Sequence, residues 1–451
     1  MTTFRRLILL SVLAVCSLAA SSQAKYVFYF IGDGMGWGHV NAAQYYNRMV
    51  RGADEPLLMM RFPVAGSLYT YSASSPVTDS AAAGTALATG NKTNNGMVGL
   101  SPDTITAYRS VARELKDRGW GVGVLTSVSA DDATPAAFYA HQPKRGMRYE
   151  IDCEAAESGY DFIGGANLSG MKDDNDVMKR LTSNGFTVVY DTDNSAADSA
   201  DKLVLLSPQG KSDIGYTIDS IPGALNLPDM TKMALKQVSR KSPDRFFLMV
   251  EGGNIDHAAH ANDGGTVIKE IVAFQDAIKV AYDFYLSHPD ETLIVVTADH
   301  DTGGMALNGK VNLGMADYQR MSKDAMSDYF REMIKNGTPV SWAEMKDFLK
   351  AKLGFWTSVK VNDAQNEMLE KAFEKTFVAR EGKDEKGLYN SFDEFVNKVF
   401  DVMNHRIGTH FTTRSHSANP VPVFAIGKGS ELFGTVMNNT EIPVKILKAT
   451  R

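Results

Sequence analysis

Short apolar runs alternate along most of the chain with longer segments whose apolar residues recur every three or four positions. Between residues 267 and 285, Val267, Ile271 and Ile278 fall on one side of a helix and Lys279 on the other, which predicts an amphipathic helix. The short runs predict buried β-strands at residues 26–31, 121–127, 186–190, 203–206, 246–250, 293–297 and 421–426. This alternation predicts an α/β fold with helices on both faces of a large, mostly parallel central sheet.

The pattern changes from about residue 317 to residue 406, where charged helical segments rich in Met and Phe replace the strands. Ser341 with Glu344 and Ser391 with Glu394 have the spacing of capping boxes, which predicts that a helix starts at each serine. We interpret this stretch as a helical insertion that caps the α/β body.

The first 24 residues have the pattern of a secretory signal. Arg5 and Arg6 precede an apolar run, and small residues at Ser22 and Ala24 fit a cleavage site. We therefore expect a periplasmic or secreted protein with no stable membrane anchor after processing. An uncleaved anchor helix and lipidation at Cys16 are the alternatives.

Three segments are thus expected: a signal peptide at residues 1–24, a single α/β domain at residues 25–451, and within it the helical cap at about 310–408. The composition, with 44% hydrophobic and 22% charged residues, is that of an ordinary globular protein and excludes a disordered or fibrous chain. The net charge of −6 argues against a nucleic-acid-binding surface, which would be basic.

Acidic side chains and a histidine come at or just after the ends of three predicted strands. They are Asp33, Glu251 and the adjacent pair Asp299 and His300. In open α/β sheets, ligands bind beyond the carboxyl ends of the strands, so these side chains are expected to converge there. Clustered carboxylates repel each other unless cations lie between them. The sequence therefore predicts a metal site at this edge.

The ligand types indicate which metals the site takes. Asp256 and His260 are four residues apart and share one face of a helical turn, and such mixed oxygen and nitrogen ligands suit zinc. Asp33 and Glu251 offer the hard oxygens that magnesium prefers. Each of these features has a structural explanation when it is taken alone. The Asp256 and His260 pair could be a surface ion pair, a strand-end aspartate could form a turn, and His300 could be a hydrogen-bonded core histidine. Their combination favours a metal site.

A candidate nucleophile lies in the segment 77–86, whose Ala-rich continuation predicts a helix. Either Asp79 or Ser80 would then lie at the helix amino end, where unpaired N–H groups favour an anion. Ser80 could be no more than the N-cap. A metal-rich crevice, however, could convert its hydroxyl into an alkoxide, the form that attacks.

At this point the sequence resembles the alkaline phosphatase family. Six blocks occur in the family's order, at residues 31–36, 77–81, 132–136, 250–260, 297–300 and 416–423. The resemblance covers nearly the whole mature chain and implies the family's three-layer sandwich of a central sheet between helices.

The resemblance also implies two zinc sites. The ligands of the first zinc would be Asp256, His260 and His416. The second zinc would be held by Asp33, Asp299 and His300, and Ser80 would contact it when free to attack.

A third site, which usually takes magnesium, would be formed by Asp33, Thr134 and Glu251. The two positions beside it carry Asp132 and His257, whereas bacterial members often have Asp with Lys and mammalian members His with His. We expect both residues to lie in the outer shell. Magnesium is favoured there, and zinc is the alternative if His257 lies close to the metal.

Arg145 would bind two phosphoryl oxygens with its planar fork, a geometry that lysine does not offer, and Arg148 is the nearby rival. The function implied is an exported phosphomonoesterase that forms a phosphoserine intermediate, acts on small phosphate monoesters and is compatible with a homodimer. The alternatives are a phosphodiesterase or phosphonate hydrolase of the same superfamily and an idle phosphate-binding protein. Sulfatase activity is disfavoured because Ser80 lacks the Cys/Ser-x-Pro-x-Arg context.

Overall fold

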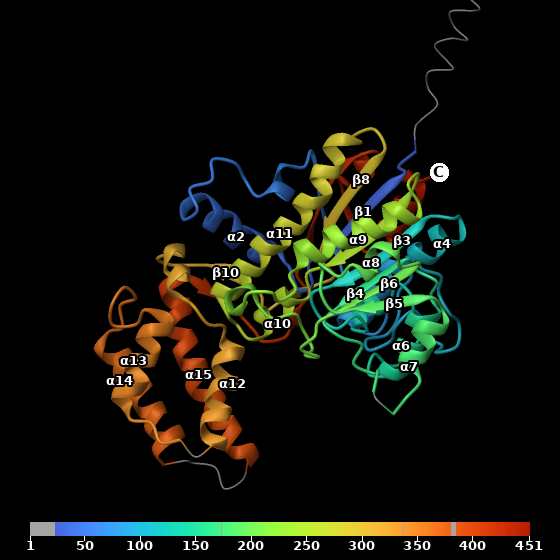
Figure 1. Ribbon diagram of the computed structural model, residues 1–451. Coiled ribbons are helices and arrows are strands. Elements are labelled where there is room, and N and C mark those ends of the chain that lie inside the picture. Colours follow the sequence, from blue (N-terminus) through green and yellow to red (C-terminus); the bar gives the residue numbers. More distant parts are fainter. Residues whose placement is uncertain (1–22, 173, 337, 380–384) are drawn as a thin grey trace, which may run out of the picture.

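A ten-stranded, mostly parallel sheet forms the centre of the molecule (Figure 1). The computed structural model describes residues 23–172, 174–336, 338–379 and 385–451. In the order in which they lie side by side, the strands are β14 (Val436–Asn438), β2 (Val64–Tyr69), β13 (Val421–Gly427), β8 (Thr292–Thr297), β1 (Tyr26–Ile31), β7 (Phe246–Glu251), β3 (Gly121–Thr126), β4 (Phe162–Gly165), β6 (Lys202–Leu206) and β5 (Phe186–Val189). Within this sheet, β13 pairs antiparallel with β2 and β8, and the other neighbours pair parallel.

All seven strands predicted from apolar runs are confirmed within one residue at each end. Three strands of the sheet were missed, β2, β4 and β14. The four residues of β4 include two glycines, and β14 has only three residues, so neither contains an apolar run that sequence periodicity can detect. The predicted mostly parallel sheet is confirmed.

Helices surround the sheet. Outside the insertion they are α2 (Trp37–Met49), α3 (Ser80–Thr89), α4 (Val111–Asp117), α5 (Ala133–Ala136), α6 (Arg148–Glu157), α7 (Val177–Ser183), α8 (Ala196–Ser199), α9 (Leu227–Lys241), α10 (Asn254–His260), α11 (Gly264–Ser287) and α16 (Glu441–Ala449). Four two-residue strands form two small ladders, β10 (Ala306–Leu307) with β11 (Thr409–His410) and β12 (His416–Ser417) with β9 (Asp301–Thr302).

Strand β1 shows why both faces of the sheet are covered. Successive side chains of a strand point to opposite faces. Phe28 lies with its ring centroid 5.6 Å from that of Phe284 in α11. Tyr29, the next residue, lies 6.0 Å from Phe138 just after α5, and its hydroxyl donates to the carbonyl oxygen of Leu87 in α3. Helix α11 therefore packs on one face, and α3 and α5 pack on the other.

The predicted insertion contains α12 (Lys323–Lys335), α13 (Trp342–Leu353), α14 (Asp363–Phe373) and α15 (Glu385–Ile407), which lie together beside the α/β body (Figure 1). A capping box at Ser341 starts α13 as predicted. The helix start predicted at Ser391 is wrong, because α15 already runs from Glu385. Phe330 and Phe377 lie with ring centroids 5.3 Å apart inside this bundle, so the insertion has an aromatic core of its own.

Side chains of the insertion hold the turn that follows α10. Lys323 Nζ donates to the carbonyl oxygen of Ala261 at 2.6 Å. Asn404 donates to the carbonyl oxygen of Asn262 at 2.7 Å and accepts from the backbone N–H of Gly264 at 3.0 Å. The insertion is therefore attached to the segment directly after His260.

Most of the predicted signal peptide, including Cys16, lies outside the described residues. Among the residues that the structure does describe, no helix has both the length and the apolar character needed to cross a membrane.

Gly38, in α2, lies against the backbone of the β9–β10 segment. A Cβ at this position would lie 1.8 Å from the carbonyl oxygen of Met305, a backbone atom that has little room to move. Gly38→Ala should therefore lower the free energy of unfolding by about 1–3 kcal/mol, measured by urea denaturation. Gly314→Ala is the matched control, because its Cβ would lie 3.5 Å from Oδ1 of Asn312, an ordinary contact distance, and it should change stability by less than about 0.5 kcal/mol. Equal stability of the two variants would contradict this packing.

Candidate active site

Three neighbouring strands end in register at the edge of the sheet where the predicted ligands lie. Ile31 at the end of β1 is paired with Glu251 at the end of β7 and with Thr297 at the end of β8. Asp33 and Asp299 follow two residues after the ends of β1 and β8. The parallel pairing therefore brings these carboxyl groups together, as the strand-end pattern predicted.

Asp33, Asp299 and His300 form one buried group. Nε2 of His300 lies 3.4 Å from Oδ1 of Asp33 and 3.1 Å from Oδ2 of Asp299. The backbone N–H groups of Gly34 and His300 donate to Oδ1 of Asp299, which fixes that carboxylate in place. One ligand atom from each of the three residues lies within 4.8 Å of the others, which is close enough for one metal ion.

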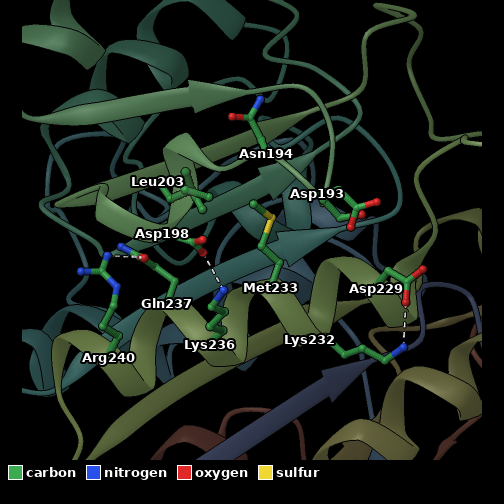
Figure 2. A pocket seen from close by; sticks show the side chains of 12 residues that line it. Asp193, Asn194, Asp198, Leu203, Asp229, Lys232, Met233, Lys236, Gln237 and Arg240 are labelled. Carbon is green, nitrogen blue, oxygen red and sulfur yellow. Dashed lines mark hydrogen bonds and ion pairs between the residues drawn. The ribbon is translucent and has the colours of Figure 1, made fainter.

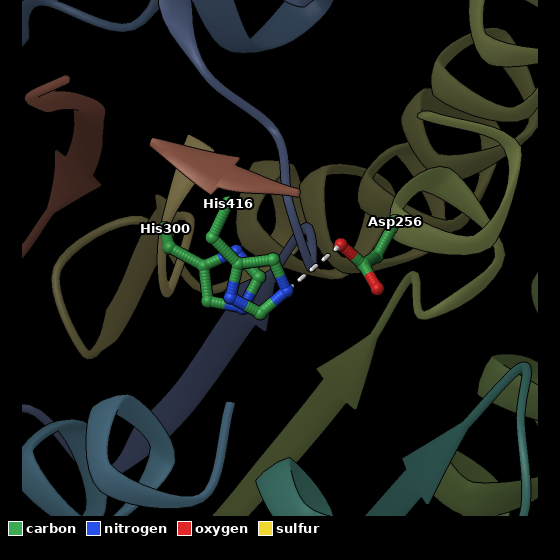
Figure 3. Close-up of side chains that lie close together, drawn as sticks. All are labelled: Asp256, His300 and His416. Atoms are coloured by element: carbon green, nitrogen blue, oxygen red, sulfur yellow. Dashed lines mark ion pairs between the residues drawn. The ribbon is translucent and has the colours of Figure 1, made fainter. Parts of the chain in front are cut away.

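Asp256, His260 and His416 form a second group beside the first. Nε2 of His260 lies 3.3 Å from Oδ2 of Asp256 and 3.0 Å from Nε2 of His416. The His416 ring stacks on the His300 ring with centroids 3.6 Å apart, and Asp256 faces both (Figure 3). His300 therefore lies at the junction of the two groups.

The hydrogen bonds of His260 and His416 fix which nitrogen of each ring carries the hydrogen. Nδ1 of His260 lies 2.6 Å from the carbonyl oxygen of Arg414, and Nδ1 of His416 lies 2.9 Å from the carbonyl oxygen of Thr78. Because a carbonyl oxygen only accepts, each Nδ1 must donate. In the neutral rings, both Nε2 lone pairs then face each other across 3.0 Å. Such an arrangement suits a shared cation.

The buried oxygens of Asp33, Thr134 and Glu251 fit a harder metal. Thr134 Oγ1, both carboxylate oxygens of Glu251, Asp33 Oδ1 and Asp299 Oδ2 have no hydrogen-bond partner within the described part of the chain. Burial, followed by the charge of Asp299, raises the pKa of Asp33 well above its usual value. Burial raises the pKa of Glu251 to about 8, and the charges of Asp132 and Asp299 add to the rise. A divalent cation would satisfy these oxygens and remove the cost of ionising them.

Ser80 is the first residue of α3, and Asp79 is its N-cap. The Asp79 side chain accepts from the backbone N–H of Ala82 at 3.0 Å. The Ser80 hydroxyl is therefore free of the capping role that the sequence had left open. Its Oγ lies 3.2 Å from Nε2 of His300, the residue at the junction of the two groups.

Two arginines lie around the Asp132 carboxylate. Arg145 donates to Oδ1 of Asp132 at 2.9 Å and lies 3.5 Å from Oδ2 of Asp79. Arg148 donates to the same Oδ1 at 3.1 Å. Burial on its own would raise the pKa of Asp132, but Arg145 and then Arg148 hold it at about 2. His257, which is half-buried, contributes a smaller lowering and is in neither of the two close ligand groups.

The model of the family described as alkaline phosphatase matches residues 24–178 and 163–451. The chain belongs to the alkaline phosphatase family. It is 29% identical over 442 residues to alkaline phosphatase 3 of Bacillus subtilis (strain 168), covering 95% of this chain and 89% of the relative. It is 28% identical over 464 residues to the repressible alkaline phosphatase of Saccharomyces cerevisiae, covering 94% and 79%.

Solved structures of alkaline phosphatases share the fold. The cold-active enzyme of a psychrophilic Shewanella superposes with a TM-score of 0.78 at 27% identity, covering 94% of this chain and 99% of that one. A mutant of the TAB5 alkaline phosphatase, solved with Mg bound, gives a TM-score of 0.65 at 29% identity, covering 95% and 98%. The chain is thus a phosphatase with the three-layer fold of its family.

Two further side chains lie near the ligand groups of this phosphatase, and the strand-end pattern did not single them out. Thr302 donates its hydroxyl to Asp256 and lies 3.2 Å from Nδ1 of His300. His39 is fully buried in α2, with Nδ1 3.5 Å from Oδ1 of Asp301. The polar run that follows β8 was the available signal for Thr302. His39 gives no local signal, because its contact depends on how α2 packs.

A separate hollow of about 480 Å³ lies between α9 and residues 192–198 of the alkaline phosphatase (Figure 2). Its lysines are already paired, Lys232 with Asp229 at 2.7 Å and Lys236 with Asp198 at 2.6 Å. None of the predicted site residues lines it. The strand-end cluster is therefore the candidate active site.

Proposed function

We propose that the chain is an exported alkaline phosphatase that hydrolyses phosphate monoesters through a phosphoserine intermediate on Ser80, with two zinc ions and one magnesium ion. The observation that carries this proposal is the pair of imidazole Nε2 atoms 3.0 Å apart, beside a serine hydroxyl 3.2 Å from His300. Two unprotonated imidazole nitrogens with carboxylates around them are typical ligands of zinc.

The residues present fit three metal ions. Asp256, His260 and His416 would hold one zinc. The group Asp33, Asp299 and His300 would hold the other, with Ser80 next to it. The unpartnered oxygens of Asp33, Thr134 and Glu251 would hold magnesium. When bound, such ions lower the pKa of a hydroxyl or a water molecule and neutralise the charge of a phosphate group.

The chain's own residues then account for the course of the reaction. Oγ of Ser80 loses its proton and forms a bond to phosphorus while the bond from phosphorus to the ester oxygen breaks, and that oxygen takes up a proton and leaves as the alcohol. Water next attacks the phosphoserine, and the bond from phosphorus to Oγ breaks to release inorganic phosphate. The Arg145 guanidinium can bind two phosphoryl oxygens throughout and so hold the group in line.

Asp132 and His257 stand beside the proposed magnesium site as outer groups. Asp132 is occupied by Arg145 and Arg148, and His257 is half-buried. Neither side chain belongs to a close ligand group among the described residues. This arrangement supports magnesium over zinc at the third site.

The pattern of residues 1–24 supports export as a signal peptide, with residues 25–451 as one domain and about 310–408 as its helical cap. The proposed location is periplasmic or secreted, without a stable membrane anchor. A homodimer is compatible with the family resemblance.

Comparing p-nitrophenyl phosphate with its bis ester tests the substrate class. We expect kcat/KM for the monoester to exceed that for the diester by about 100-fold or more, because a diester has one fewer free oxygen for Arg145 and one fewer negative charge for the cations. The same assay with a phosphonate ester measures the remaining alternative. Faster turnover of the diester or the phosphonate would replace the monoester as substrate.

A further inference from the structure

One carboxylate oxygen receives three donors next to the proposed phosphate site. Oδ1 of Asp132 accepts from the backbone N–H of Ala133 at 2.7 Å, from Arg145 at 2.9 Å and from Arg148 at 3.1 Å. A carboxylate oxygen has two lone pairs, so a third donor weakens the hold on the other two. Arg145 and Arg148 therefore compete for the same atom.

Arg148 is anchored from outside the site. It donates to the carbonyl oxygen of Asp131 and lies 3.5 Å from that residue's Oδ1. Asp131 is fully buried, and its Oδ2 accepts from the backbone N–H groups of Ser169 at 3.0 Å and Gly170 at 3.3 Å. This network holds Arg148 against Asp132 through contacts that lie outside the site.

Within the described part of the chain, the Arg145 guanidinium has no comparable anchor. Its side-chain partners there are Asp132 and Asp79, and both belong to the site itself. To bind two phosphoryl oxygens, Arg145 must weaken its contact with Asp132. The strength of that contact therefore affects how readily the arginine binds phosphate.

We propose that Arg148 is a positioning residue that shares Oδ1 of Asp132 and so limits how tightly this carboxylate holds Arg145 away from the phosphoryl group. The inference rests on the proposed function, in which Arg145 binds phosphate. Arg148 acts through Asp132 and does not itself contact the substrate.

Arg148→Met removes the arginine that shares Oδ1 of Asp132, so this carboxylate should hold Arg145 more tightly and away from phosphate. We expect KM for p-nitrophenyl phosphate and Ki for inorganic phosphate to rise about tenfold, the equivalent of one hydrogen bond to a charged group. We expect kcat to change less than about threefold, because the bonds that form and break are untouched. Steady-state kinetics on the metal-loaded enzyme, with phosphate as the inhibitor, measures all three values.

A double-mutant cycle separates positioning from direct attraction. In an Asp132→Asn background the shared charge is gone, so Arg148→Met should change Ki for phosphate by less than about twofold. If Arg148 instead attracts phosphate by its own charge, Ki will rise equally in both backgrounds. That result, or an unchanged Ki in the Arg148→Met single variant, would overturn the inference.

Two controls complete the experiment. Arg180→Met removes an arginine that is paired with Glu157 and Asp176 on the surface, and it should leave Ki within about twofold. Arg148→Lys keeps the charge but loses the fork, so a rise smaller than that of Arg148→Met is expected. If Arg148→Met does not fold, Arg148→Lys replaces it in the double-mutant cycle. Calorimetric titration with inorganic phosphate reports the Arg148 effect even without turnover, so failure of the proposed function and failure of this inference are distinguishable.

Discussion

Ser80→Ala should lower kcat for p-nitrophenyl phosphate by about 10³-fold or more. The hydroxyl is placed at the start of α3, free of the capping role and 3.2 Å from His300, so its removal deletes the proposed attacking atom without disturbing the helix. Binding of inorganic phosphate should change far less, because Arg145 and the metal ligands remain. Steady-state kinetics and phosphate titration on the metal-loaded variant measure the two effects.

Thr89→Ala is the matched control for this variant. Thr89 ends the same helix, and its hydroxyl donates to the carbonyl oxygen of Thr85 at 2.8 Å. We expect kcat within about twofold of the unmodified enzyme. If Ser80→Ala retained a similar rate, the serine would not be the nucleophile.

Metal removal should abolish activity and destabilise the protein, and the destabilisation should grow with pH. Burial, with the charges of Asp132 and Asp299, raises the pKa of Glu251 from 4.5 to about 8 in the metal-free fold. Between these values the folded protein keeps a proton that the unfolded chain has lost, so metal-free stability falls as pH rises through this window. Bound cations replace that proton. The Tm difference between metal-loaded and chelated protein should therefore be small near pH 5 and large near pH 8.

Glu251→Gln provides the control for this pH dependence. The variant has no carboxyl group to ionise at this position, so the melting temperature of its chelated form should fall less steeply from about pH 5 to pH 8. Differential scanning calorimetry on both proteins gives the comparison. If chelation left the Tm unchanged at every pH, a metal cluster at the strand ends would be contradicted.

The sequence predicted the strands of the site well because each is an apolar run bounded by polar residues. Glu251 and Asp299 could be placed at one edge because parallel strands end together. The N-cap of α3 could not be decided in the same way. Aspartate and serine are both good caps, and only the contact of Asp79 with Ala82 shows which one is used.

Periodicity and spacing alone do not show which distant side chains meet, and only the family resemblance placed His260 and His416 in one site. His260 and His416 are separated by 156 residues. Their Nε2 atoms face each other because each Nδ1 is bound to a backbone carbonyl oxygen, that of Arg414 or that of Thr78. Arg145 and Arg148 appeared in the sequence as rivals for one role. The structure places both on the same oxygen of Asp132, a geometry that spacing alone does not specify.

The most direct measurement is an acid quench of the metal-loaded enzyme during turnover of a radiolabelled phosphate monoester, followed by peptide mapping. The account predicts covalently bound phosphate on the peptide that contains Ser80, and none in Ser80→Ala. Active enzyme that carries no trapped phosphate, or that carries it on another residue, would contradict the account.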